Sequence, residues 1–290
     1  MINKYRLTSP AFEREKEEDK ISPKKVYFIA VEGNITEVEY FDMINQHREE
    51  LGIHSLITIE PLKRSNKDTN SDPMHVISLL EEYLSDRGKS DEDFEKEIAQ
   101  LTNNNFSLET IRAFISDSSN LTDKEQIQLS SFLQNIGYDL AYKKYLSQYD
   151  NEYDEFCVVV DRDQYCHTEQ SLLTCLEHCI QNNYRFLITN PCFEFWLLLH
   201  VCDIKTEYKN NLSDIKENIK ISNSHTYISK ELSNKVGHGK KIKRCASIYL
   251  NNIHKAIKRS RDFKTDPKDI IYDIGTNLGE FIDEIISYKI

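Results

Sequence analysis

Two apolar stretches of the chain each end in an acidic residue, and this pattern constrains the fold more than any other feature of the sequence. Residues 26–31 are followed by Glu32, and residues 156–160 are followed by Asp161. Because their hydrophobicity is continuous and does not alternate, both stretches are typical of strands buried on both faces of a parallel sheet. Helical patterns separate them, so we expect an α/β fold with a parallel-sheet core and flanking helices.

Further strands and helices follow from the same patterning. Strands are expected at 56–60 and 185–189. Thr36 and Glu39 are spaced as a capping box, which predicts a helix with Thr36 as its N-cap, and Asn190 is the candidate N-cap of a second, apolar helix. The predicted helices are 36–46, 73–85, 168–182, 192–201, 205–221, 227–232, 240–261 and 277–288.

The character of the chain changes outside these strands. The amino-terminal residues alternate between acids and bases, which predicts a flexible arm. A long polar stretch between the two acidic strand ends has apolar residues at helical spacing, as expected of a helical insertion. We therefore divide the chain into an arm at 1–24, a core at 25–85 and 154–202, a helical insertion at 86–153, and a basic helical region at 203–290 that packs on the core.

The charge of the chain is unevenly distributed. Its net charge of −11 would repel phosphates, but residues 235–264 contain ten Lys or Arg and one Asp, so this run carries +9 and the remainder −20. Such a run forms either a solvated helical face or a surface that binds nucleic acid. The candidate nucleic-acid contacts are Lys230, Lys240, Lys241, Lys243 and Arg244.

The apolar runs and the cysteines indicate the cellular compartment in which the protein lies. Residues 1–25 contain no apolar segment of the kind found in a secretory signal, and the longest apolar run, 195–202, is too short to span a bilayer. Seven cysteines without a CxxC pair do not resemble a disulfide framework. We therefore expect a cytoplasmic protein. The spacing of Cys and His between positions 166 and 179 fits no standard zinc site.

Three carboxylates are expected at one edge of the sheet. Glu32 follows the first strand and Asp161 and Asp163 follow the later one, and the carboxyl ends of parallel strands line a crevice that binds ligands. Asp161 and Asp163 are two residues apart on an extended segment and should point to the same side. Carboxylates suit Mg²⁺ or Mn²⁺, and Gly33 leaves room for a phosphate. The alternative is that either aspartate only caps the following helix or turn.

Three blocks of sequence resemble the RloB-like family. They are EGNITEVEYF at 32–41, DRD at 161–163 and TNPCFEFWLLLH at 189–200. RloB-like proteins are regarded as Toprim-like, sharing the metal-binding fold of topoisomerases, primases and related nucleases. The resemblance implies that Glu32, Asp161 and Asp163 form the metal site, with Glu32 also the general acid/base.

The resemblance also implies an activity. The family is linked to restriction loci and anti-phage defence, where related Toprim effectors cut nucleic acid, including tRNA. We therefore expect a Mg²⁺-dependent nuclease acting on the phosphodiester bonds of RNA or DNA. Glu37 and Glu194 are further catalytic candidates, although either could serve only as a charge at a helix start.

Two other functions stay open. The first is a regulatory sensor whose Toprim site binds a nucleotide or a partner ATPase without cutting. The second is an adaptor protein in which the acids are turn residues. The sequence also permits an oligomer, and nothing in it requires one.

Overall fold

The chain divides into two compact units in the computed structural model. The smaller unit contains Glu81–Glu152, and the larger one consists of Ser22–Leu80 and Tyr153–Ile290. None of the described helices combines the length and the apolar character needed to cross a membrane. The structure describes residues 25–33, 35–62, 72–116, 121–136, 138–147, 154–223, 225–237 and 241–288, so the arm expected at 1–24 lies outside the described residues.

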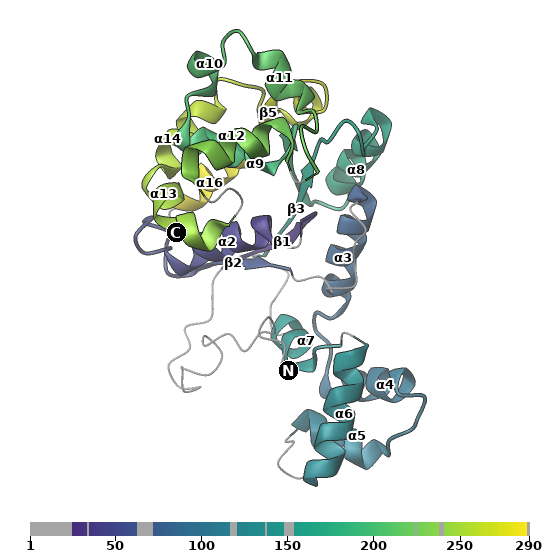
Figure 1. Cartoon of the computed structure of the whole chain (residues 1–290). Coiled ribbons are helices and arrows are strands. Elements are labelled where there is room, and N and C mark those ends of the chain that lie inside the picture. The colour runs from purple at the N-terminus through teal and green to yellow at the C-terminus, as the bar shows by residue number, and fades with distance from the viewer. Residues whose placement is uncertain are drawn as a thin grey trace. The chain divides into compact units, whose positions relative to one another are not determined.

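A five-stranded sheet forms the centre of the larger unit, with the strand order β2-β1-β3-β4-β5 (Figure 1). Strands β1 to β4 are parallel, and β5 is antiparallel to β4. This arrangement confirms the predicted α/β fold with a mostly parallel sheet, as a Toprim-like fold requires. The strands are β1 (Lys25–Val31), β2 (Ile57–Pro61), β3 (Glu155–Asp161), β4 (Arg185–Asn190) and β5 (Gly275–Thr276).

Helices cover both faces of this sheet. Figure 1 shows α8 (Glu169–Gln181) against one face, and α2 (Thr36–Gln46), α9 (Phe193–Val201) and α12 (Tyr227–Val236) on the other. Coverage of both faces explains why the strands are apolar without alternation. The other helices of this unit are α3 (Pro73–Ser85), which continues into the smaller unit, α10 (Ile204–Glu207), α11 (Leu212–Glu217), α13 (Ile242–Asn251), α14 (Ile253–Ser260), α15 (Pro267–Ile270) and α16 (Leu278–Ser287).

Helix α9 lies at the centre of the core. All its residues from Phe193 to His200 are buried, because β4, α12, α13 and α14 contact it from several sides. A helix that is apolar all round is stable only in such surroundings. His200 is part of this core: its Nδ1 donates to the Trp196 carbonyl (3.0 Å) and its Nε2 accepts from the Tyr40 hydroxyl (3.2 Å). Burial lowers the pKa of His200 to about 3, so the ring is neutral.

Two predicted helix caps are wrong. Helix α2 does begin at Thr36, but Ile35 occupies the N-cap position and no side chain caps the helix. Glu39 instead pairs with Lys243 of α13 (3.5 Å). Asn190 is the last residue of β4, and its side-chain amide donates to the Ile270 carbonyl (2.7 Å), so that Cys192 is the N-cap of α9. In both cases tertiary contacts outweigh the local capping preference.

Two of the predicted carboxyl-terminal helices are divided in the structure, whereas the helix expected at 227–232 extends to Val236. The helix expected at 205–221 is divided into α10 and α11, and the helix expected at 240–261 is divided into α13 and α14 at Asn252. Strand β5 was not predicted, because two residues leave no apolar pattern. It contributes Thr276, whose hydroxyl lies 2.8 Å from that of Thr189 in β4.

Four helices form the smaller unit around a core of its own. They are α4 (Asp91–Leu101), α5 (Leu108–Ser116), α6 (Asp123–Asn135) and α7 (Leu140–Ser147). Capping boxes begin α4 at Ser90 and α6 at Thr122. The carboxylate of Asp86 is fully buried and accepts from the ammonium groups of Lys89 and Lys143, each at 2.6 Å. The ion pair between Asp86 and Lys143 connects the start of the smaller unit to α7.

We predict that Asp86→Ala destabilises the smaller unit, because it removes the buried carboxylate 2.6 Å from the Lys143 ammonium and leaves that group only the more distant Glu97, at 3.9 Å. The expected cost is about 2–4 kcal/mol. Hydrogen–deuterium exchange of α4 in the full chain measures the effect. Glu95→Ala is the matched control, since it removes a pair with the exposed Arg112 (2.8 Å) and should change exchange little. Equal exchange in the two variants would contradict the prediction.

Candidate active site at the carboxyl edge of the sheet

Glu32 and Asp161 are joined directly at the carboxyl ends of β1 and β3. One carboxylate oxygen of Glu32, Oε2, accepts a hydrogen bond from the backbone N–H of Asp161 (3.0 Å). Oδ1 of Asp161 accepts from the backbone N–H of Phe193 (2.8 Å), which begins α9. Asp161 therefore lies at a helix N-terminus, where the helix dipole favours negative charge.

Three carboxylates act on the carboxyl group of Asp161 at this edge. Burial raises the pKa of the Asp161 carboxyl well above its usual range, and the negative charges of Glu32, Glu37 and Glu194 raise it further. The hydrogen bond from Phe193 opposes this rise without cancelling it. Ionised Asp161 is thus disfavoured until a cation lies nearby.

Glu37 and Glu194 are both buried, with 8% and 7% of their surface exposed. Glu37 lies in the first turn of α2 and Glu194 in the first turn of α9. Gly33 explains the position of Glu37, because a methyl group at Gly33 would lie 2.0 Å from a carboxylate oxygen of Glu37. The Glu37 side chain therefore occupies the space that a side chain at position 33 would fill.

Asp163 has a different environment from Asp161. The strand ends at Asp161, so the extended segment that we expected to continue through Asp163 does not. Oδ1 of Asp163 instead accepts from the backbone N–H of Tyr165 (3.0 Å), and its own N–H donates to the Pro191 carbonyl (3.0 Å). Asp163 thus has the turn-capping contact considered as its alternative role, and it also lines a pocket.

His167 is a site residue that the sequence analysis missed. Its Nε2 lies 3.2 Å from Oε1 of Glu32, and its side chain is almost fully buried. Burial lowers the pKa of His167, but the hydrogen bond to Glu32 and the charges of Glu32, Asp163 and Asp72 outweigh it, so the pKa is raised. On the sequence alone, this histidine was considered only as a zinc ligand. Its place in the loop that follows an acid-terminated strand was the signal that could have identified it.

Arg162 holds the loop between Asp161 and His167 in place. Its guanidinium is buried and donates from Nε to the Ile271 carbonyl (2.7 Å) and from NH1 to the His167 carbonyl (2.9 Å). The middle residue of the DRD block therefore has a positioning role, because it fixes the backbone on which the two aspartates and His167 lie.

The donor set fits a hard divalent cation by its chemistry. All the acidic groups are carboxylates, and Mg²⁺ at phosphoryl-transfer sites uses only one or two of them, together with water and substrate phosphate. Within the described ranges, no three His, Cys, Asp or Glu side chains surround a common point. Glu32, Asp161 and Asp163 are therefore not grouped as a three-ligand metal site, and a cation at this edge would need water or another ligand besides the carboxylates.

The basic run is divided among several structural roles. Six of its described cations bind protein groups. Lys235 pairs with Glu207, Lys243 with Glu39, Arg261 with Asp283 and Lys264 with Asp269. Arg259 donates to the Leu199 and His200 carbonyls, and Lys255 donates to the side-chain oxygen of Asn252. Of the candidate contacts, Lys230, Lys241 and Arg244 are exposed, and Lys240 lies outside the described residues. Because α13 contacts α2, Lys243 lies near the helix that carries Glu37.

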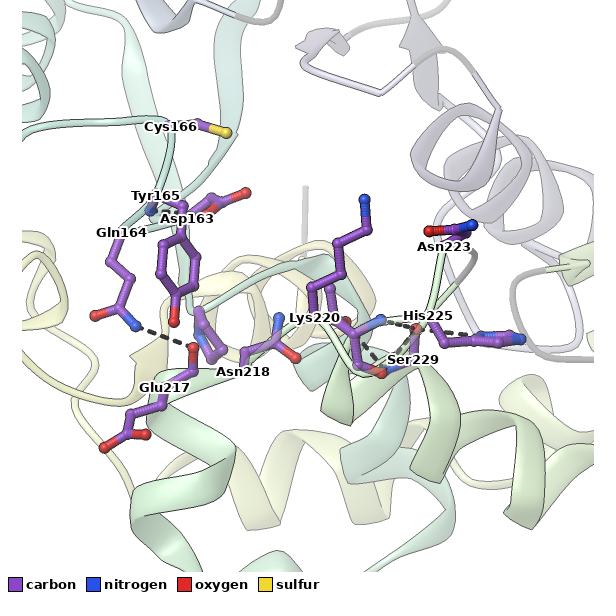
Figure 2. A pocket seen from close by; sticks show the side chains of 12 residues that line it. Asp163, Gln164, Tyr165, Cys166, Glu217, Asn218, Lys220, Asn223, His225 and Ser229 are labelled. Carbon is purple, nitrogen blue, oxygen red and sulfur yellow. Dashed lines mark hydrogen bonds between the residues drawn. The ribbon is translucent and has the colours of Figure 1, made fainter.

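A pocket of about 440 Å³ adjoins the acidic edge at Asp163. Figure 2 shows Asp163 and Tyr165 on one side of it and Lys220, Asn223 and His225 on the other. The edge thus joins a cluster of carboxylates to a polar pocket, which is the usual composition of a site for a charged ligand.

The fold is α/β with a mostly parallel sheet, consistent with a Toprim-like fold, and carboxylates gather at the carboxyl edge of this sheet. A model of the RloB-like protein family matches residues 27–285, and the chain therefore belongs to this family. The match extends beyond the three resembling blocks into the carboxyl-terminal helices. No curated protein and no solved structure matches the chain significantly.

We predict that Asp161→Asn raises the thermal unfolding midpoint in EDTA at neutral pH. The folded pKa of Asp161 lies above its unfolded value of about 4, so the wild type loses stability as the pH rises through the folded pKa. The amide removes the charge and keeps an acceptor for Phe193. The midpoint should rise by about 2–4 °C for each kcal/mol of repulsion relieved. A variant that is less stable than the wild type would show that the repulsion is not significant.

We predict a coupling between Gly33 and Glu37. Gly33→Ala should lower the unfolding midpoint, and the same change in a Glu37→Ala background should be neutral or stabilising, because the carboxylate no longer occupies the space. The coupling energy is expected to be on the order of 1 kcal/mol. Equal effects in the two backgrounds would mean that Glu37 does not lie against Gly33.

Proposed function

We propose that this RloB-like chain is a Mg²⁺- or Mn²⁺-dependent nuclease that hydrolyses phosphodiester bonds of RNA, including tRNA, or of DNA. The observation that supports this most is the gathering of carboxylates at the carboxyl edge of the sheet. Glu32 accepts from the Asp161 N–H (3.0 Å), and Glu37 and Glu194 are buried in the first turns of α2 and α9. Gathering like charges costs free energy, and a divalent cation offsets that cost. When bound, such a cation supplies charge for the phosphate and a more acidic water.

The chain's own groups have distinct roles in this proposal. Asp161 holds the cation, oriented by the Phe193 N–H, and Glu37 and Glu194 add negative charge around it. Glu32 accepts the proton of the attacking water. His167 orients the Glu32 carboxylate through the 3.2 Å contact and stabilises its charge. This pairing of a carboxylate and an imidazole is common in acid–base catalysis.

The exposed cations supply the contact with the substrate backbone. Lys241 and Arg244 lie at the start of α13, next to α2, and Lys230 lies on α12, whose residue Ser229 lines the pocket. Membership of the family motivates the further proposal that the protein acts in anti-phage defence with a partner ATPase. Its seven free cysteines are compatible with a reducing cytoplasm.

A module that binds nucleotides without cutting is the second candidate. The arrangement of Glu32 favours it, because both carboxylate oxygens already contact protein groups, the Asp161 N–H and the His167 ring. A general base must release one of these contacts to reach water. The two functions differ in whether Glu32 is needed for turnover.

The deciding experiment is a cleavage assay with Mn²⁺ or Mg²⁺ on tRNA, single-stranded DNA and duplex DNA. We expect the wild type to cut at least one substrate and Glu32→Gln to lose activity by about 10²–10⁴-fold, because the proton acceptor is lost. Asp161→Asn should lose activity together with Mn²⁺ binding, measured by calorimetry.

Glu177→Gln is the matched control, since Glu177 is exposed on α8. It should cut like the wild type. If Glu32→Gln binds Mn²⁺ and cuts at the wild-type rate, Glu32 is not the base. If the wild type binds Mn²⁺ and nucleic acid but cuts no substrate, the nuclease proposal fails and the non-cutting module replaces it.

A further inference from the structure

The pocket beside Asp163 has the size and the shape of a ligand site. Its volume of about 440 Å³ lies within the range of small-molecule sites, which is about 300–1,000 Å³. One side is formed by the turn after β3, and the other by the segment that precedes α12 (Figure 2).

Hydrogen bonds hold both sides of the pocket in place. In the turn after β3, the N–H of Cys166 donates to the Asp163 carbonyl (3.0 Å), and the Gln164 side chain donates to the Glu217 carbonyl (2.9 Å). In the opposite segment, the N–H of Ile221 donates to the His225 carbonyl (3.0 Å). The pocket is therefore formed before a ligand enters, which lowers the entropic cost of binding.

Tyr165 exposes an aromatic ring in this pocket. Its exposed fraction is 67%, although its backbone is held by the hydrogen bond to Asp163. A large ring that is fixed at its base and open to solvent offers a flat apolar face. Aromatic faces of this kind bind bases of single-stranded nucleic acid by stacking, with little dependence on sequence.

Two polar groups face Tyr165 across the pocket. Lys220 and Asn223 are exposed, and Figure 2 shows both side chains extending from the opposite segment. Within the part of the chain that the structure describes, Lys220 makes no ion pair. An ammonium group binds a phosphate, and an amide binds the donor and acceptor edge of a base. The stacking face and the amide together match the base of a nucleotide, and the cation matches its phosphate.

We propose that this pocket binds one unpaired nucleotide of a single-stranded nucleic acid, with its base on Tyr165 and its phosphate at Lys220. The inference rests on the proposed function and names its substrate class: the bond cut at the carboxylates lies in an unpaired segment. A duplex is a poor ligand, because its base faces are already stacked.

Cys166 provides a readout that needs neither metal nor cleavage. It lines the pocket, and it is the exposed member of the seven cysteines. In EDTA, a single-stranded RNA of mixed sequence at ten times its dissociation constant should slow alkylation of Cys166 by iodoacetamide about tenfold. The same RNA annealed to its complement, at equal concentration, should protect weakly. Cys166→Ser verifies the labelled position.

The pocket variants test the contacts. Tyr165→Ala should weaken single-strand binding about 5- to 150-fold, since each stacked base contributes that much, and Tyr165→Phe should retain it. Tyr272→Ala, at another exposed tyrosine, should bind like the wild type. Lys220→Gln should reduce the slope of log affinity against log salt by about one. Wild-type affinity in Tyr165→Ala would overturn the proposal.

The outcomes separate this inference from the nuclease proposal. Protection of Cys166 by the single strand, without cleavage of any substrate, would support the pocket while the nuclease proposal fails. Metal-dependent cleavage with no protection of Cys166 would overturn the pocket alone. Protection by 5′-AMP or 5′-UMP at lower concentration than by the oligonucleotide would also overturn it, in favour of a free-nucleotide site.

Discussion

The hydrogen bond from the Asp161 amide to the Glu32 carboxylate is the contact on which the site depends. It joins residues 129 positions apart in sequence. Because Asp161 also accepts from Phe193, the first turn of α9 lies at the same point. Pairing of Val31 with Val159 between β1 and β3 sets these positions. A shift of one residue in this register would turn Glu32 to the other face of the sheet and disperse the carboxylates.

The gathered carboxylates are tolerated because the core beside them is large. Helix α9 carries Glu194 at the site and six buried apolar side chains between Phe193 and Leu199. Each such side chain contributes about 1.5–3 kcal/mol. Ionised Asp161 is disfavoured beside Glu32, Glu37 and Glu194, as the raised pKa of its carboxyl shows. The site therefore has a charge excess that a cation or a proton must balance. The carboxylates at this edge lower the stability of the fold, and the apolar packing of α9 raises it.

The strands and their acidic ends could be predicted because apolar continuity is a local property of the sequence. The contacts of individual side chains could not be predicted from the sequence. Thr36 and Asn190 have the local signature of helix caps, but neither caps a helix, since other elements determine where α2 and α9 begin. The position of His167 in the loop after β3 places it near the site, but its contact with Glu32 exists only once β1 and β3 are adjacent. Sequence patterns thus identified the edge of the sheet, and tertiary contacts determined how its groups are paired.

The loop that follows β3 carries residues of both parts of the site, the carboxylate cluster and the pocket. Asp161 and His167, at its ends, contact Glu32, whereas Asp163 and Tyr165, between them, line the pocket. Arg162 fixes the backbone that separates the two sets, through its bonds to the Ile271 and His167 carbonyls. Because a few consecutive residues carry both sets, any movement of this loop alters the carboxylates and the pocket together. The carboxylates and the pocket are therefore connected through one buried guanidinium, and an arginine suits this position because it has several donors in a fixed plane.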